Sequence, residues 1–218
     1  MSKRLPARER ILRVALRELV KRGHEAASTN AIAAAAGVAK GLVFHYFGTK
    51  DGLYLAVHDA QLERLQAAVV GADADAPLPT DLFERLHALA VRKLRAFQDD
   101  PLAYQFLVAA AADPPPSLRA ALARRRDALA GDGWRRILDG IDTSRLRPGL
   151  DLAAAVETVT ILSDGLERRV FPRLAALPDR GASQLAAITA ELWAHFARLR
   201  DGLYGDAPVQ STTGPGQP

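Results

Sequence analysis

The residues with the clearest chemistry are gathered between Ser28 and Asp51, in the segment STNAIAAAAGVAKGLVFHYFGTKD. Two hydroxyls and an amide open it at Ser28, Thr29 and Asn30, and Lys50 stands near its end. A lysine, a histidine and three aromatic rings lie between them. Hydroxyls, cations and free backbone N–H groups bind phosphate, whereas rings and polar side chains contact base edges. This combination predicts nucleic-acid binding.

Two very short helices around a glycine turn must position these side chains. Ser28 or Thr29 is expected to cap the first helix, which ends at Gly37 after about two turns. The second helix should cover about 39–45. Such a pair is typical of a helix-turn-helix, which needs a small residue and a glycine at its turn. The residues that would pack the two helices together are Ile32, Ala36 and Val38.

Length and composition set limits on the rest of the chain. Its 218 residues, 49% hydrophobic and 25% charged, are ordinary for one large globular domain or for a small domain joined to a larger one. No apolar run approaches the roughly 18–20 residues that span a bilayer. The N-terminal MSKRLPARER lacks the apolar core of a signal peptide, and there is no cysteine. We therefore expect a cytoplasmic protein without a membrane segment.

Charge is distributed unevenly along the chain. Residues 1–50 carry ten basic and three acidic side chains, a net charge of +7, whereas the remainder carries −3. A basic head on a mildly acidic body favours a polyanion as partner. The same arginines and lysines could equally be the solvated face of the first helix, so composition alone leaves both interpretations open.

Apolar residues recur at helical spacing throughout, which predicts an all-α fold. The first helix should run from about Pro6 to Lys21, with Gly23 as a left-handed C-terminal cap. Thr49 should cap a fourth helix that has Asp51 in its first turn. Further helices are expected at about 80–99, 101–112, 117–139, 150–171 and 183–203.

Prolines and glycines divide the predicted body. The three prolines at 114–116 should separate two of its helices. Gly131 and Gly133 should kink or split the helix that follows. The tail from Gly205 is too poor in apolar residues to pack and is expected to be disordered.

The block from Arg10 to Leu53 resembles the DNA-binding domain of the TetR family of bacterial transcriptional regulators. The resemblance implies an N-terminal helix-turn-helix head at 1–48 and a larger C-terminal helical domain at 49–204 for effector binding and dimerisation, followed by the tail at 205–218. It also implies a DNA-binding regulator, more specifically a repressor. The residues that carry the resemblance are Gly23, Ser28, Thr29, Ile32, Ala33, Ala36, Gly37, Val38, Lys40, Gly41, Phe44, Tyr46, Phe47, Lys50 and Leu53.

The family's DNA contacts carry over position by position. Two positions depart from its pattern, because Ala39 stands where serine is usual and Phe44 where tyrosine is common. Phe47 fits a core role better than a DNA contact, and Phe44 fits both roles. The predicted DNA-binding residues are Ser28, Thr29, Asn30, Lys40, Gly41, Leu42, Phe44, His45, Tyr46 and Lys50.

The resemblance implies two further surfaces in the body. In the family, the last two helices pair with those of a second subunit, although these residues could also be intrachain core. A pocket for a small-molecule effector would lie among the middle helices, where ordinary packing is the alternative for each residue. The predicted dimer contacts are Leu162, Gly165, Leu166, Leu192 and Phe196. The predicted effector contacts are Arg92, Phe97, Tyr104, Phe106, Trp134, Glu157 and Thr158.

The interpretation is a homodimeric repressor that binds a palindromic operator and is released by a small-molecule effector. No cofactor is expected, and His58, Asp59 and Glu63 are better explained as polar side chains in contact with solvent than as a metal site. Two alternatives stay open. The same fold could act as a ligand-binding co-regulator through a protein partner without DNA, or it could be a helical enzyme, although the five scattered histidines form no catalytic constellation in the sequence.

Overall fold

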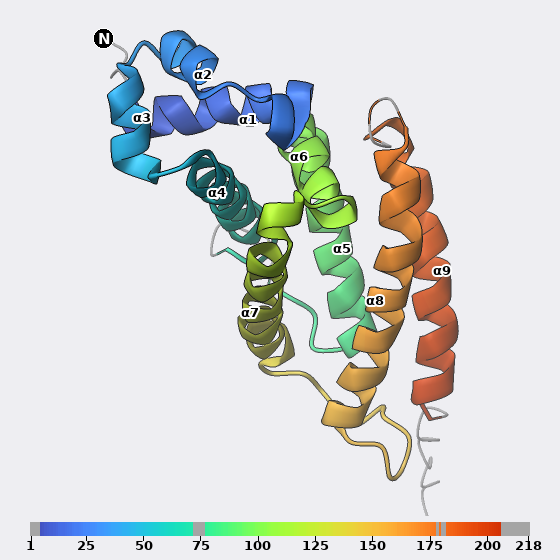
Figure 1. Ribbon diagram of the computed structural model, residues 1–218. Helices are drawn as coiled ribbons and strands as arrows, with labels where there is room; N and C mark the ends of the chain where they lie inside the picture. Colours follow the sequence, from blue (N-terminus) through green and yellow to red (C-terminus); the bar gives the residue numbers. More distant parts are fainter. Residues whose placement is uncertain (1–4, 72–76, 178, 180–181, 206–218) are drawn as a thin grey trace, which may run out of the picture.

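The computed structural model describes residues 5–71, 77–177, 179 and 182–205, and this part of the chain is helical (Figure 1). Two short 3-10 helices accompany the α-helices, and the described ranges hold no strand beyond one isolated bridge between Leu146 and Tyr204. The all-α prediction is confirmed. The α-helices are α1 (Ala7–Ala26), α2 (Thr29–Ala36), α3 (Lys40–Phe47), α4 (Lys50–Val70), α5 (Leu82–Asp99), α6 (Pro101–Ala112), α7 (Arg119–Leu138), α8 (Leu152–Ala175) and α9 (Leu185–Leu203).

Side-chain caps explain where most of these helices begin. The Ser28 hydroxyl accepts from the Ala31 N–H of α2, and the Thr49 hydroxyl accepts from the Gly52 N–H of α4. Aspartates do the same at α5, α6 and α8, through Asp81, Asp100 and Asp151. Each cap satisfies a backbone donor that has no partner inside its helix, which is worth about 1 kcal/mol. The predicted caps at Ser28 and Thr49 are therefore present.

Three local details differ from the sequence prediction. Gly23 has the expected positive φ of 72°, but its ψ of 175° is extended, and the chain forms another helical turn as far as Ala26. The helix α3 continues to Phe47, beyond the predicted end near residue 45. Gly131 and Gly133 were expected to kink or split their helix, and the split is absent, since α7 is one helix from Arg119 to Leu138. A penalty of about 1 kcal/mol per glycine is too small to interrupt it.

A shared core joins the head, α1 to α3, to the body. Helix α1 packs against α2 and α4 and also against α6 of the body. Its buried face consists of Ile11, Leu12, Ala15, Leu16 and Leu19, as the apolar spacing predicts, and the same cluster reaches Phe106 of α6. Helices α8 and α9 lie side by side along the edge of the body farthest from α3 (Figure 1). The head therefore rests on the body through α4 and α6.

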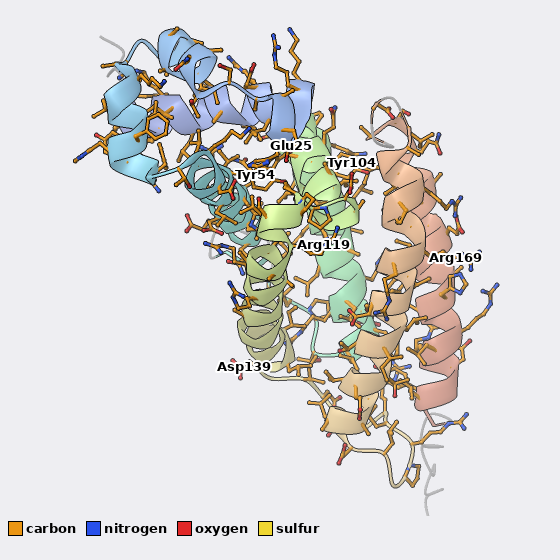
Figure 2. The ribbon with its side chains drawn as sticks, in the orientation of Figure 1. Glu25, Tyr54, Tyr104, Arg119, Asp139 and Arg169 are labelled. Atoms are coloured by element: carbon orange, nitrogen blue, oxygen red, sulfur yellow. The ribbon has the colours of Figure 1, made fainter. Side chains whose placement is uncertain are left out.

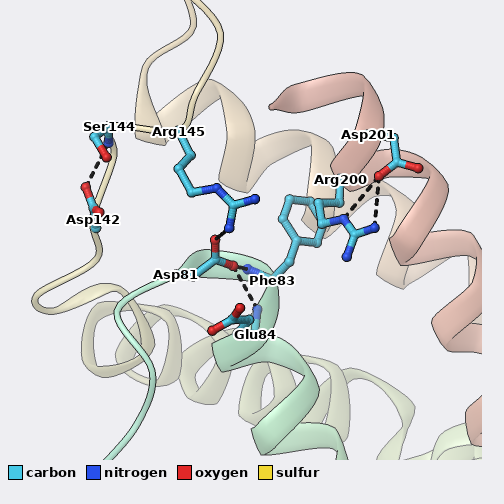
Figure 3. A network of polar contacts seen from close by, with 8 residues as sticks. All are labelled: Asp81, Phe83, Glu84, Asp142, Ser144, Arg145, Arg200 and Asp201. Atoms are coloured by element: carbon cyan, nitrogen blue, oxygen red, sulfur yellow. Dashed lines mark hydrogen bonds and ion pairs between the residues drawn. The ribbon is translucent and has the colours of Figure 1, made fainter. Parts of the chain in front are cut away.

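The end of the body away from the head is closed by a polar network (Figure 3). Asp81 caps α5 and pairs with Arg145 of the α7–α8 loop at 2.7 Å. The Arg145 guanidinium lies 4.7 Å from the centre of the Tyr204 ring, which contacts Phe83 edge-on. Burial raises the pKa of Tyr204 to about 12, and the nearby Asp81 carboxylate adds to the effect.

The predicted disorder of 205–218 concerns residues that, apart from Gly205, lie outside the described ranges.

Candidate nucleic-acid interface

The outward face of α3 gathers five of the predicted DNA contacts. Lys40, Gly41, Phe44, His45 and Tyr46 are all exposed. The rings of Phe44 and Tyr46 are large apolar groups, yet they are 40% and 43% exposed. Exposed aromatic rings of this size on a short helix are unusual unless a partner covers them.

Two local contacts order this face. The Lys40 ammonium lies 5.9 Å from the centre of the Phe44 ring, and the His45 and Tyr46 rings meet edge-on at 5.5 Å. On the opposite side of α3, Val43 is 2% exposed and anchors the helix in the core. One side of α3 is therefore fixed by packing, whereas the other presents a cation and three rings to solvent.

Gly41 is not required by the fold. It has helical backbone angles, and a methyl group built on it would meet no heavy atom within 4 Å. A glycine inside a helix costs about 1 kcal/mol relative to alanine. Open space at this exposed position leaves room for another molecule to approach the α3 backbone closely.

Two glycines fix how α3 is joined to α4. Gly48 has φ 71° and ψ −58°, and this tight turn lets the Thr49 N–H donate to the Phe47 carbonyl at 2.7 Å. A methyl group on Gly52 would overlap the same Phe47 carbonyl oxygen. The Phe47 ring is half-buried in the core cluster, which agrees with its expected packing role. The start of α4 therefore holds the end of α3 at close range.

The predicted phosphate-binding residues at the start of α2 are only partly available. Asn30 is exposed, whereas Ser28 and Thr29 are half-buried, and the Ser28 hydroxyl is already occupied as a cap. Glu18 accepts from the Ser28 N–H at 3.4 Å, which brings a carboxylate close to this helix start. Leu42, another predicted contact, is also half-buried.

Lys50 is bound within its own chain. Its ammonium donates to the Glu25 carbonyl at 2.9 Å, which ties the last turn of α1 to the start of α4. An ammonium has three donors, so this bond leaves capacity for a phosphate. The phosphate role of Lys50 stays a prediction.

The six predicted effector contacts whose side chains are described fall into separate parts of the structure. Phe97 and Tyr104 meet with ring centres 4.9 Å apart, and burial raises the pKa of Tyr104 to about 12, with Asp179 contributing. Phe106 belongs instead to the core cluster shared with the head. Arg92 lies outside both groups and donates to the Val69 carbonyl. Glu157 and Thr158 are exposed on α8, and the side chain of Trp134 is outside the described part.

The predicted dimer contacts divide into two groups. Leu166 is 9% exposed, and Leu192 and Phe196 pack against clusters of their own chain. Leu162 is half-buried, whereas Gly165 faces outward with open space around it. Ile161 beside it is 66% exposed, and sequence reasoning missed it. Its exposure could not be read from the sequence, because α8 is apolar on several sides.

Three buried polar residues were also missed. Arg85 of α5 is 5% exposed and donates to the carbonyls of Pro79, Ile137 and Asp139. His58 and Gln61 of α4 are buried at 8% and 3% exposure. Burial lowers the pKa of His58, against opposing effects of its partner Asp59.

Metal and membrane sites find no support in the part of the chain described. Those residues contain no group of three or more histidine, aspartate or glutamate side chains placed to hold a metal ion. Among the helices of the described ranges, none combines the length and the apolar character that a membrane crossing requires.

Comparison with known proteins agrees with this geometry. The family described as bacterial regulatory proteins, tetR family, matches residues 11–57, which include α2, α3 and the start of α4. No curated protein matches the chain significantly.

Solved structures match almost the whole chain. A TetR-like transcriptional regulator from Rhodococcus sp. RHA1 is 21% identical, with a TM-score of 0.61 over 91% of this chain and 100% of that one. The fatty acid degradation regulator FadR from Bacillus halodurans is 17% identical, with a TM-score of 0.61 over 88% and 97%. A putative tetR family regulator from Shewanella sp. PV-4 is 21% identical, with a TM-score of 0.59 over 93% and 100%.

At such identities these structures show a shared fold, and the family match concerns the head. The fold, the exposed α3 face and the match over residues 11–57 agree with one another, and they point to a DNA-binding transcriptional regulator. Residues 11–57 of this chain match the tetR family of bacterial regulatory proteins, and its fold is shared with solved structures described as TetR-family regulators.

Proposed function

We propose that this chain is a homodimeric repressor that binds a palindromic operator and leaves it when a small-molecule effector binds the body. The observation that carries the proposal is the outward face of α3, with its cation, its exposed rings and its open glycine. In this proposal residues 1–48 read DNA, and residues 49–204 bind the effector and the second subunit.

The dimensions and chemistry of α3 suit the major groove. That groove is about 12 Å wide and admits one helix. Lys40 and His45 supply hydrogen-bond donors for base edges or phosphates, and the Phe44 ring can pack on a thymine methyl. Gly41 allows the backbone to come close. Thr29, Asn30 and Lys50 would hold the neighbouring phosphates.

The outer face of α8 and α9 is the proposed dimer surface. Ile161 is 66% exposed, and Gly165 and Gly202 both have open space where a side chain would be. Exposed alanines on α9, such as Ala190 and Ala194, continue this small apolar surface. A two-fold dimer formed here would carry two heads, so its operator would be a palindrome with half-sites about one helical turn or a multiple apart.

Release requires an effector that prefers the conformation unable to bind the operator. A shift from mostly bound to mostly free needs roughly 5 kcal/mol of such preference. Helix α4 is placed to transmit it, because it packs against α1 of the head and against α5 and α6 of the body. Phe97 and Tyr104 are the predicted effector contacts that already lie together.

Footprinting of the DNA that flanks the gene of this protein tests the proposal. We expect a protected region with two symmetric halves, and a reporter driven by that region should be less active when the protein is present. An Ile161→Glu variant should sediment as a monomer and protect the same region only at much higher concentration. Protection of a single asymmetric site by a monomeric wild-type protein would contradict the homodimer.

A further inference from the structure

A cavity of about 350 Å³ lies where the head meets the body, between the end of α1, α4 and the end of α6. Its apolar walls are Leu19, Tyr54, Phe106, Ala109 and the three prolines 114–116. This volume is at the lower end of those that hold small ligands. The cavity is separate from the Phe97–Tyr104 contact in the effector proposal. Glu25 and Tyr54 mark the junction in Figure 2.

An unsatisfied histidine faces this cavity. The His24 side chain is 7% exposed and lines the cavity, yet neither ring nitrogen makes a well-aligned hydrogen bond. Nε2 lies 2.8 Å from the Asp51 carboxylate in a poorly aligned contact, and Nδ1 lies 3.5 Å from the Glu25 carboxylate. A buried polar atom without a partner costs free energy. In a neutral imidazole one ring nitrogen carries a proton and the other carries only a lone pair. One of the two His24 nitrogens therefore faces a carboxylate with no proton between the two acceptors.

The charges at the rim decide which ligand fits. Glu25 and Asp113 place two carboxylates at the cavity, and the Asp113 side chain has no recorded partner among the described residues. Arg22 also reaches the rim, but its guanidinium is paired with Glu18 at 3.1 Å. The uncompensated charge at the rim is therefore negative. The rings of Tyr54 and Phe106, whose centres are 5.0 Å apart, add faces that attract cations.

We propose that this junction cavity binds a small organic ammonium with an apolar body. The ammonium would donate to His24 Nδ1 and to the Glu25 carboxylate, which face each other 3.5 Å apart. Its apolar part would lie between Tyr54, Phe106 and the prolines. A charged donor between two acceptors satisfies both of them, which no described side chain does.

Occupation of this cavity would act on the joint between head and body. The His24 ring meets Tyr54 edge-on at 5.4 Å, and Tyr54 in turn meets Phe106 of α6. A ligand here touches all three residues and so holds α1, α4 and α6 in one arrangement. The effect on operator binding rests on the proposed function, whereas binding of the ligand itself does not.

Calorimetry on the full chain without DNA tests the cavity, with 2-phenylethylammonium as the probe. We expect saturable binding, and affinity about tenfold or more lower for phenylacetate and for 2-phenylethanol, which lack the cation. An Ala109→Phe variant should fill the cavity and abolish binding. Ala111→Phe, on the exposed side of the same helix, is the matched control and should bind as the wild type does. Equal affinity for phenylacetate, or undiminished binding by Ala109→Phe, overturns the proposal.

A second variant keeps the test independent of core packing. Glu25→Gln combined with Asp113→Asn changes two exposed side chains and should weaken binding of the ammonium by about tenfold or more while leaving the melting temperature unchanged. Unchanged affinity in this variant also overturns the proposal. A mobility-shift titration with and without the probe then measures the effect on DNA, so failure to find an operator remains distinct from failure to bind the ammonium.

Discussion

The outward face of α3 and the interior of the body use their cations in opposite ways. In the body, Arg85 and Arg147 donate to carbonyls of their own chain, and the Arg85 side chain is buried while doing so. On α3, the Lys40 ammonium lies over the Phe44 ring but makes no hydrogen bond or ion pair with any described residue. A cation bound by its own backbone stabilises the fold, whereas a cation left exposed is available to a partner.

The same contrast occurs inside the head. Arg10 donates to the carbonyls of Leu5 and Ala36 and so secures the start of α1 against the end of α2. The head's net charge of +7 in residues 1–50 therefore overstates the number of cations free for DNA. Charge counting locates a basic region, but only the contacts show which cations can bind phosphate.

The largest expected effect is on stability and comes from Arg85. Replacing the buried Arg85 by alanine removes its packing and leaves three backbone carbonyls without their donor, so we expect the free energy of unfolding to fall by about 3 kcal/mol. Urea denaturation measures the change. Arg95→Ala, at an exposed position on the same helix, is the control and should change stability by less than about 0.5 kcal/mol. Similar losses in both variants would show that burial does not distinguish these arginines.

Lys40 should show the opposite pattern. Lys40→Ala removes an exposed cation from the α3 face, so operator affinity should fall by about 1–3 kcal/mol while the unfolding free energy stays the same. Mobility shifts and urea denaturation on one protein preparation measure both quantities. A variant that loses stability but keeps its affinity would place Lys40 with the cations of the body.

Lys50 lies between the cations that are bound within the fold and those that are left exposed, because its ammonium is bound to the Glu25 carbonyl. If it also binds phosphate, Lys50→Ala should weaken binding to all DNA sequences and lower the slope of affinity against salt by about one unit. The measurement is a salt titration of operator and unrelated DNA. Equal salt slopes in variant and wild type would assign Lys50 to the fold alone.

The smallest expected effect is a pH dependence from His58. Burial lowers its pKa below the unfolded value of 6.5, so the unfolded chain binds the proton more readily. The contribution of His58 to the free energy of unfolding is complete above about pH 6.5. It is lost as the pH falls through the folded pKa, at no more than about 1.4 kcal/mol per pH unit. Denaturation curves of wild type and His58→Gln between these limits measure it. Parallel pH profiles for the two proteins would contradict this contribution.

Local signals in the sequence predicted much of the fold. Ser28 and Thr49 act as caps, Gly37 takes the left-handed conformation after α2, and Pro101 opens α6, as each residue's own chemistry requires. These features depend on residues within one helical turn of each other. The exposed face of α3 could be predicted for the same reason, and the family resemblance supplied the expectation that this face contacts DNA.

Features that depend on distant partners could not be predicted. Arg85 resembles a solvated residue on an amphipathic helix, and its partners Ile137 and Asp139 lie more than fifty positions away. The described members of the predicted effector contacts lie in separate parts of the structure, because helical spacing shows which residues share a face but not which faces meet. His58 and Gln61 are buried for the same reason, although their polarity suggested an exposed surface.

The turn between α3 and α4 has a consequence for engineering. Gly48 and Gly52 bring the Phe47 carbonyl so close to α4 that α3 and the start of α4 are held together as one unit. Phe44 takes part in this joint through its backbone carbonyl, which accepts from the Gly48 N–H at 2.8 Å, whereas its exposed ring does not. If the outer face of α3 contacts DNA as proposed, the side chains of Lys40, Phe44, His45 and Tyr46 can be replaced to change the DNA sequence that is bound, provided that both glycines are kept.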